Sequence, residues 1–396
     1  MDAHLVEWLN ILLRWAHVIV GIGWIGTSFY FVALDMSLRK REGLAPGVMG
    51  SAWLVHGGGF YSVEKYASAP ANMPPDLQWY KWEAYLTFLT GFALLAVMYY
   101  WNAQTYLIDP RVFAMTPATA IALSLVSLTL GWFVYDAMCK SPLGKQPVLL
   151  ATMVFAFLIL MTWGFTHIFS GRGAFIHIGM LVGTIMVANV RFIIIPNQKK
   201  IVADLIAGRT PDPALGAAGK NRSMHNTFLT LPVILFMISN HYPILHSHPH
   251  AWLVAALVIV MGALARWFWV RHEAHDPISR IGWAVPAAAG VLAVAVVMTA
   301  PRIDPAMAGM RVADTRVLEI VQTHCAACHA AKPTLEGFSE APKGIRLETL
   351  DLIRAHSSAV MSQAVTTQAM PLGGFTEMKD EERRELGAWL LAQRVR

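Results

Sequence analysis

Charged side chains are scarce in this chain. Asp, Glu, Lys and Arg make up only 14% of its 396 residues, whereas 56% are hydrophobic and the mean hydropathy is +0.47. Such a composition excludes an ordinary soluble globular protein and indicates a membrane protein. The formal charge of +6 is spread over the segments between apolar stretches. It therefore reflects membrane topology and does not predict a nucleic-acid partner.

Cysteine is also rare, since the chain has only three copies, and this excludes a disulfide framework. Two of them, Cys325 and Cys328, flank a pair of alanines and directly precede His329. In a Cys-x-x-Cys-His pattern the two thiols form thioethers with a haem, and the histidine binds the iron. The alternative, a redox Cys-x-x-Cys, is disfavoured because no βαβ pattern lies nearby. The motif predicts a covalent haem c, and Cys139 is expected to be a packed, unreactive thiol.

Met370 is the predicted second axial ligand of this haem. It lies 41 residues after His329 and is followed by Pro-Leu-Gly-Gly, a turn that can carry a thioether to the open face of the iron. A methionine ligand would raise the haem potential and suit electron transfer. Most methionines only fill cores, and Met361, Met378 and His356 compete for the same role.

Two helices are expected to frame the haem, at 314–323 and 379–393. Residues 312–396 are then a small class I cytochrome c domain, joined to the rest of the chain by a linker at 301–311. The apolar spacing predicts which residues face inward. They are Val317, Ile320 and Val321 in the first helix, and Leu386, Trp389, Leu390 and Gln393 in the second.

Residues 1–300 contain windows long enough to cross a bilayer, about 20 residues each. We therefore predict an all-α fold, with an eight-helix transmembrane bundle before the cytochrome domain. Turn residues such as Asp109-Pro110 and Pro196-Asn197 separate the windows, and no internal repeat is recognisable. The first window is not expected to be a cleaved signal, because the segment before it has no Lys or Arg. The eight windows are 9–34, 83–101, 118–138, 147–169, 174–196, 224–242, 251–270 and 281–300.

Lysine and arginine are distributed unequally between the two sets of loops. The loops 35–82, 139–146, 197–223 and 271–280 together hold 14, whereas 1–8, 102–117, 170–173 and 243–250 hold 2. The positive-inside rule places the first set in the cytoplasm. The N-terminus and the cytochrome domain are then periplasmic, on the side where haem c is attached, in a multi-pass protein of a bacterial inner membrane.

Histidines within the apolar windows are a second candidate centre, because ionisable groups are costly in lipid. On the predicted topology His17, His167 and His177 fall in the periplasmic half, and Arg14 stands one turn from His17. Histidines on facing helices can hold a non-covalent haem b. The alternative is that they are interfacial side chains satisfied by water or by loop carbonyls.

The long segment 36–82 lacks the Lys-Ser/Thr pair that follows the glycines of a P-loop, which argues against phosphate binding. It is too aromatic for disorder. Its His56, Tyr61, Glu64 and Lys65, together with Arg14, are candidate catalytic residues for a flat anionic substrate. An interfacial re-entrant segment is the equal alternative. Other polar residues of the cytoplasmic half are expected to snorkel or to cap helices. They are Glu83, Asp136, Asn189, Arg191, His225, Asn226, Arg266 and His272.

The stretch 14–30, RWAHVIVGIGWIGTSFY, the motif HGGGFY at 56–61, and eight spans fused to a cytochrome c motif resemble the bacterial membrane-bound urate oxidases, or urate hydroxylases. This resemblance implies oxidation of urate to 5-hydroxyisourate in purine catabolism. It also implies that electrons leave through haem c to a respiratory acceptor, either a soluble cytochrome c or a terminal oxidase. The first helix is also similar to that of small membrane haem proteins of the protoporphyrinogen oxidase type, which supports a haem near His17.

Two alternatives stay open at this stage. The chain lacks any flavin, nicotinamide or molybdenum motif. It could therefore be a non-catalytic membrane electron-transfer subunit whose partner carries the substrate chemistry. A dehydrogenase for quinol or another small molecule is the other alternative.

Overall fold

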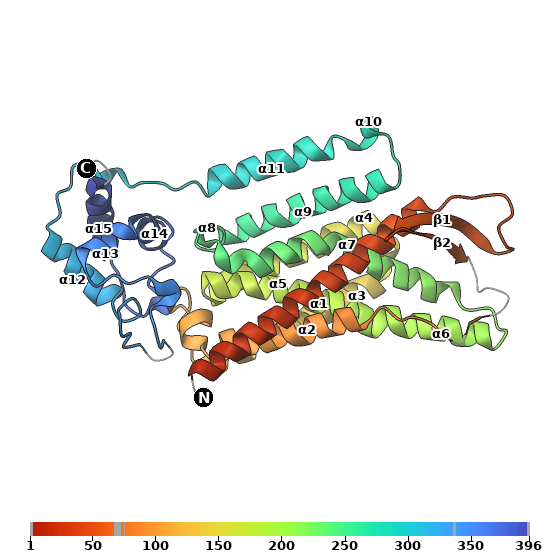
Figure 1. The fold of residues 1–396 in the computed structure, drawn as a ribbon, viewed down its shortest axis with the longest axis horizontal. Coiled ribbons are helices and arrows are strands. Elements are labelled where there is room, and N and C mark those ends of the chain that lie inside the picture. The colour runs from red at the N-terminus through yellow and green to blue at the C-terminus, as the bar shows by residue number, and fades with distance from the viewer. Residues whose placement is uncertain (1–2, 67–72, 75, 336–337, 394–396) are drawn as a thin grey trace.

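The computed structural model describes residues 3–66, 73–74, 76–335 and 338–393. These residues are mostly helical. Figure 1 shows a long bundle of helices with a smaller C-terminal region at one end, beside the N-terminus. The only sheet formed by the described residues is a hairpin at the opposite end of the bundle.

Every predicted apolar window contains a helix. Within the described residues, however, only seven helical segments are long and apolar enough to cross a membrane. The exception is α7, whose first half carries Lys220, Arg222 and Asn226 yet packs between α5 and α9. Seven of the eight predicted spans are therefore supported. The helices are α1 (Ala3–Ser37), α2 (Trp82–Leu95), α3 (Pro117–Lys140), α4 (Pro147–Ile168), α5 (Gly171–Ala188), α7 (Pro213–Ile238), α9 (Ala251–Glu273) and α11 (Ala284–Met298), with the short α8 (Pro243–His246) and α10 (Ile278–Ile281) between them.

The predicted break at Pro196-Asn197 is wrong. Helix α5 continues through a π-helical segment, η4 (Asn189–Ile194), into α6 (Ile195–Ile206), so that 171–206 form one helical segment. Pro196 stands in the first turn of α6, where a missing backbone N–H is tolerated, and the π-helix changes the hydrogen-bond register just before it.

The all-α prediction is wrong for part of the segment 36–82. Strands β1 (Val48–His56) and β2 (Gly59–Tyr66) form an antiparallel hairpin in which His56 pairs with Gly59. The two-residue turn, Gly57-Gly58, has positive φ angles of 60° and 78°. Two positive φ values match the twist of paired strands, and glycine adopts them without strain. The glycine run is thus a hairpin turn.

The bundle is organised around α5, whose residues are almost all buried. Its neighbours are α3, α4 and α7, and these four helices contribute most of the buried apolar core. The outer helices α1 and α11 bury little of their surface within the chain. Their apolar side chains are therefore left for lipid, as expected for the rim of a membrane bundle.

The C-terminal region has an apolar core of its own. Helices α12 (Asp314–His324) and α15 (Asp380–Gln393) confirm the two helices expected there, and the shorter α13 (Leu350–Ala355) and α14 (Ser357–Val360) lie between them. The residues predicted to face inward are buried, apart from the half-buried Gln393. Trp389 also donates to Asp314 at 2.7 Å and so joins α15 to the start of α12.

Candidate functional site

The Cys-x-x-Cys-His motif begins where α12 ends. The backbone N–H groups of Cys328 and His329 both donate to the carbonyl oxygen of Cys325, at 3.1 and 2.9 Å, and this closes a tight turn. Burial, reinforced by the Cys328 thiol, raises the pKa of Cys325 to about 12. Burial also raises the pKa of Cys328. Both cysteines are free thiols, as the predicted thioether chemistry requires, and Cys325 packs against the apolar core of this region.

His329 is oriented by the segment that follows it. Its Nδ1 lies 2.8 Å from the carbonyl oxygen of Ile345, and its own carbonyl accepts from Leu347 at 2.8 Å. Because a carbonyl can only accept, Nδ1 carries the proton and Nε2 carries the lone pair. An N–H fixed in this way is the usual arrangement of a metal-binding histidine.

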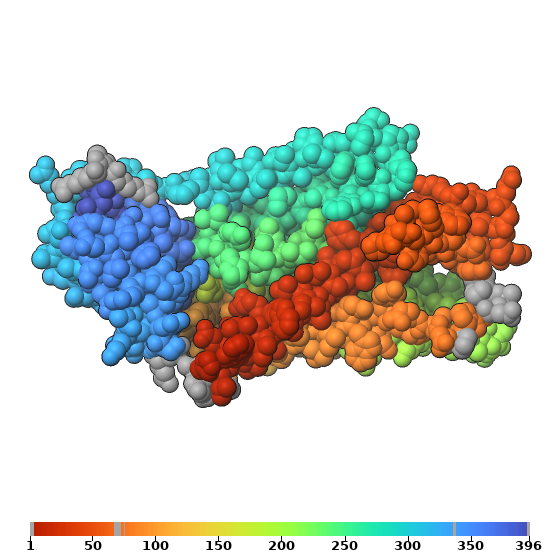
Figure 2. Space-filling view, in the orientation of Figure 1, coloured from red at the N-terminus to blue at the C-terminus, as the bar shows by residue number. Residues whose placement is uncertain are grey.

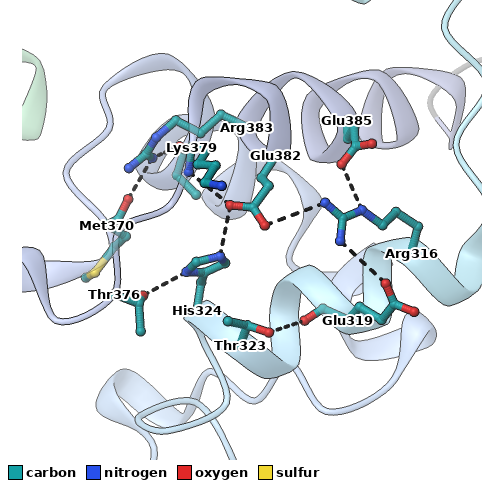
Figure 3. A network of polar contacts seen from close by, with 11 residues as sticks. Arg316, Glu319, Thr323, His324, Met370, Thr376, Lys379, Glu382, Arg383 and Glu385 are labelled. Atoms are coloured by element: carbon teal, nitrogen blue, oxygen red, sulfur yellow. Dashed lines mark hydrogen bonds and ion pairs between the residues drawn. The ribbon is translucent and has the colours of Figure 1, made fainter.

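Met370 is held through its backbone. Its N–H donates to Gln363 at 2.9 Å, and its carbonyl accepts from the buried guanidinium of Arg383 at 2.8 Å. Figure 3 shows that the Met370 sulfur points away from Arg383 and from the ion-pair network around Arg316 and Glu382. The loop is thereby anchored while the thioether is left to contact another group.

The competing ligands occupy different positions. Met361 and Met378 are buried in the apolar core of the C-terminal region, whereas Met370 lies at its edge. His356 follows α13, and its backbone carbonyl accepts from Val360. Two of the three alternatives are therefore core methionines, which leaves Met370 as the best placed of the methionines for an axial role.

The Met370 loop lies against the end of the bundle, where Figure 2 shows the C-terminal region in contact with it. Gly373 has a φ of 59°, and a Cβ there would approach the Gln104 carbonyl oxygen to 2.6 Å. Gln104 belongs to η2 (Ala103–Leu107), which lies between α2 and α3, and η9 (Leu372–Gly374) packs directly upon it. The contact needs a glycine on both steric and conformational grounds.

A cavity of about 400 Å³, with both polar and apolar residues in its lining, lies where the two regions meet. Met370 and Gln363 line it from the C-terminal region, and Tyr106, Arg172 and His246 line it from the bundle. It brings residues of the predicted haem loop and of the bundle to one site. We call it the interface cavity.

The three histidines of the predicted second haem site have separate surroundings. His17 contacts Thr90 at 3.0 Å and lines another, apolar cavity of about 440 Å³. His177 is fully buried, with Nδ1 2.7 Å from the Gly173 carbonyl and Nε2 2.6 Å from the Ser124 hydroxyl. His167 packs against the Trp163 ring at a tilt of 35° and lines the interface cavity. The second haem remains a prediction, and the structure does not gather its proposed ligands around one cavity.

The candidate catalytic residues likewise lie at opposite ends of the helix bundle. Arg14 lies on α1, where it donates to Asn10 at 3.1 Å. His56, Tyr61, Glu64 and Lys65 belong to the hairpin beyond the other end of α1 (Figure 1). Lys65 pairs with Asp35 at 2.7 Å, and Glu64 accepts from Tyr66 at 3.3 Å. His56 and Tyr61 are exposed.

Two polar groupings were not predicted from the sequence. One is a buried network in which Arg222 and Tyr135 join Asp136, Asn189 and Asn226, residues that were expected only to snorkel or cap. The other is the pair Arg172 and His246 in the interface cavity. The sequence identifies Arg172 only as one of the loop charges, and nothing in the spacing of these two residues indicates that they line one cavity.

Comparison with protein-family models identifies a family for most of this chain. No curated protein and no solved structure matches this chain. The family described as urate oxidase N-terminal matches residues 3–300, which cover the whole helix bundle and most of the chain. Its match ends before the linker and the Cys-x-x-Cys-His motif. The chain therefore belongs to the urate oxidase N-terminal family.

Proposed function

We propose that this protein oxidises urate to 5-hydroxyisourate within the membrane bundle and passes the electrons to a covalent haem c in its C-terminal region. The reaction removes two electrons and two protons from urate and adds one whole water molecule, whose oxygen becomes the new hydroxyl group. The electrons then leave to a respiratory acceptor. The family match over 3–300 supports the substrate, and the fused motif supports the electron acceptor.

The residues of the C-terminal region fit a haem c. Cys325 and Cys328 would attach it, His329 would bind the iron through Nε2, and Met370 would be the second axial ligand. Such a group, when bound, accepts electrons one at a time. The protein's own part is to fix the His329 imidazole through Ile345 and the Met370 loop through Arg383.

The observation that carries the proposal is the position of the Met370 loop. This loop forms part of the wall of a cavity, and most of the other lining residues belong to the urate oxidase-related bundle. A substrate in that cavity would lie beside the predicted haem ligand, so that electrons need to cross only a short distance. A chain that only relayed electrons for a partner enzyme would not need a cavity lined by an arginine and a histidine at this place.

We expect the purified single chain to bleach urate and to reduce its own haem at the same time. The measurement is anaerobic mixing with urate, followed at the urate absorbance and at the reduced haem band. A Cys325→Ala/Cys328→Ala variant should retain no haem after acid acetone extraction and should lose urate oxidation. Bleaching of urate at the full rate by this variant would refute electron transfer through haem c. An inert wild-type chain would favour the electron-transfer subunit instead.

For the topology we propose that the C-terminal region is periplasmic and that β1–β2 and α6 are cytoplasmic. The charge asymmetry of the loops supports this, as does the placement of these elements at opposite ends of the bundle (Figure 1). In a Cys139→Ser background, an impermeant thiol reagent should label Lys332→Cys in intact spheroplasts but label Lys200→Cys only after lysis. Labelling of Lys200→Cys in intact spheroplasts would overturn the orientation.

A further inference from the structure

We infer that the interface cavity is the binding site for a planar, singly charged heteroaromatic anion, with Arg172 as its charge partner and His246 as its hydrogen-bond partner. The inference rests on the proposed function for the identity of the ligand. It assigns the site to residues at the predicted periplasmic end of the bundle, where none of Arg14, His56, Tyr61, Glu64 and Lys65 lines the cavity.

Arg172 supplies a charge that the protein leaves uncompensated. Within the described part of the chain it forms no ion pair, and its buried Nε has no hydrogen-bond partner. Its closest polar contact is a long one, from Nη2 to the Asn240 carbonyl at 3.4 Å. The guanidinium lies 5.6 Å from the centre of the Tyr106 ring. Arg172 itself is half-buried, but a guanidinium whose Nε is buried without a partner is unfavourable unless an anion binds to it.

The charge of Arg111, in contrast to that of Arg172, is paired with a carboxylate. Arg111 also lines the cavity, but it forms a two-pronged contact with Asp109, at 3.0 Å through Nε and 2.7 Å through Nη2. Its charge is therefore neutralised within the protein. Arg172 stands in the first turn of α5, where the helix dipole adds to the positive potential. The net positive charge of the cavity wall is thus concentrated at Arg172.

His246 supplies the second unused group. Its side chain is buried, with 6% of the residue exposed, and Nε2 has no partner among the described residues. Burial and the Arg172 charge lower the pKa of His246 to about 3, so that the imidazole is neutral. Gly171 packs against the backbone of His246, and Phe175 contacts its ring edge-on. The imidazole is held in place and can exchange a hydrogen bond or a proton with a ligand.

The size and the lining of the cavity favour a purine-sized ligand over a simple inorganic anion. Its volume of about 400 Å³ falls in the ordinary range for small-molecule sites. The amide side chains of Gln363 and Gln368 line the opposite wall, from the C-terminal region. Amides match the alternating N–H and C=O groups at the edge of an oxidised purine, and Tyr106 offers an aromatic surface.

The test is equilibrium dialysis of urate against detergent-solubilised holoprotein whose haem has been fully reduced, so that no turnover occurs. Arg172→Gln and His246→Gln should each weaken urate binding about tenfold or more. The first variant removes the charge partner of the ligand, and the second removes its buried hydrogen-bond partner. Arg172→Lys should retain part of the affinity. The matched controls are Arg191→Gln, on the same helical segment, and His241→Gln, an exposed histidine; both should bind as the wild type does.

Unchanged urate binding in Arg172→Gln, with normal haem absorbance and melting temperature, would overturn the site. Inorganic phosphate that competes as strongly as urate would overturn the heteroaromatic specificity. If Arg172→Gln fails to fold, His246→Gln and Arg172→Lys decide the question. The proposed function fails separately, when wild-type protein binds urate through Arg172 but never reduces its own haem with it.

Discussion

Met370→Ala is expected to lower the reduction potential of the proposed haem c and to abolish the weak charge-transfer band of methionine ligation. Axial ligation sets haem potentials over a range of about 0.8 V. Loss of a thioether should therefore lower the potential by on the order of 0.1 V. Covalent attachment should persist, since Cys325, Cys328 and His329 are unchanged. Potentiometric titration and the near-infrared spectrum of the oxidised protein measure both effects.

Met361→Leu and Met378→Leu are the matched controls for this prediction. Both methionines are buried in the core of the C-terminal region, and leucine preserves most of their volume. We expect these variants to keep the charge-transfer band and the potential. Persistence of the band in Met370→Ala, or its loss in Met361→Leu, would show that the ligand is not Met370.

The sequence was sufficient for most of the bundle because apolar side chains must face lipid wherever a helix crosses it. Windows of sufficient length therefore coincide with helices in the structure. The hairpin was missed because the long segment 36–82 was interpreted as a functional loop or a re-entrant segment, although Gly57-Gly58 is a typical two-residue hairpin turn. The continuation past Pro196 was missed because a π-helical segment is decided by packing and leaves no clear signal in the sequence.

The candidate sites also differ in how far apart their residues lie in the sequence, and this decides how well each site can be predicted. A Cys-x-x-Cys-His motif is local, since five consecutive residues define both the attachment and one ligand. The Met370 loop is 41 residues away, and its packing on η2 depends on contacts with a part of the chain more than 250 residues earlier. Arg172 and His246 meet only because α8 packs on the first turn of α5. No periodicity in the sequence predicts such a contact, because the cavity depends on tertiary packing alone.

Arg222→Met is expected to cause the largest loss of stability in the bundle. Arg222, on α7, donates to Asp136 of α3 at 2.6 Å and to Asn189 of η4 at 3.1 Å. Its guanidinium also lies 5.1 Å from the centre of the Tyr135 ring. Only 6% of the Arg222 side chain is exposed. Removing one partner of a buried ion pair costs about 3–5 kcal/mol, because the other charge stays buried. Lys140 also pairs with Asp136, at 2.6 Å, and should keep the loss near the lower end.

The control for this prediction is Arg209→Met. Arg209 pairs with Asp204 at the same 2.6 Å, but 63% of its side chain is exposed, so its removal should cost less than about 1 kcal/mol. Thermal unfolding in one detergent compares the two variants directly. In the double variant Arg222→Met/Asp136→Asn the loss should be smaller than the sum of the two single losses, because no carboxylate is left buried without its guanidinium. If Arg222→Met melts no lower than Arg209→Met, the network does not hold α3, η4 and α7 together. This network would then not explain why the polar first half of α7 lies inside an apolar bundle.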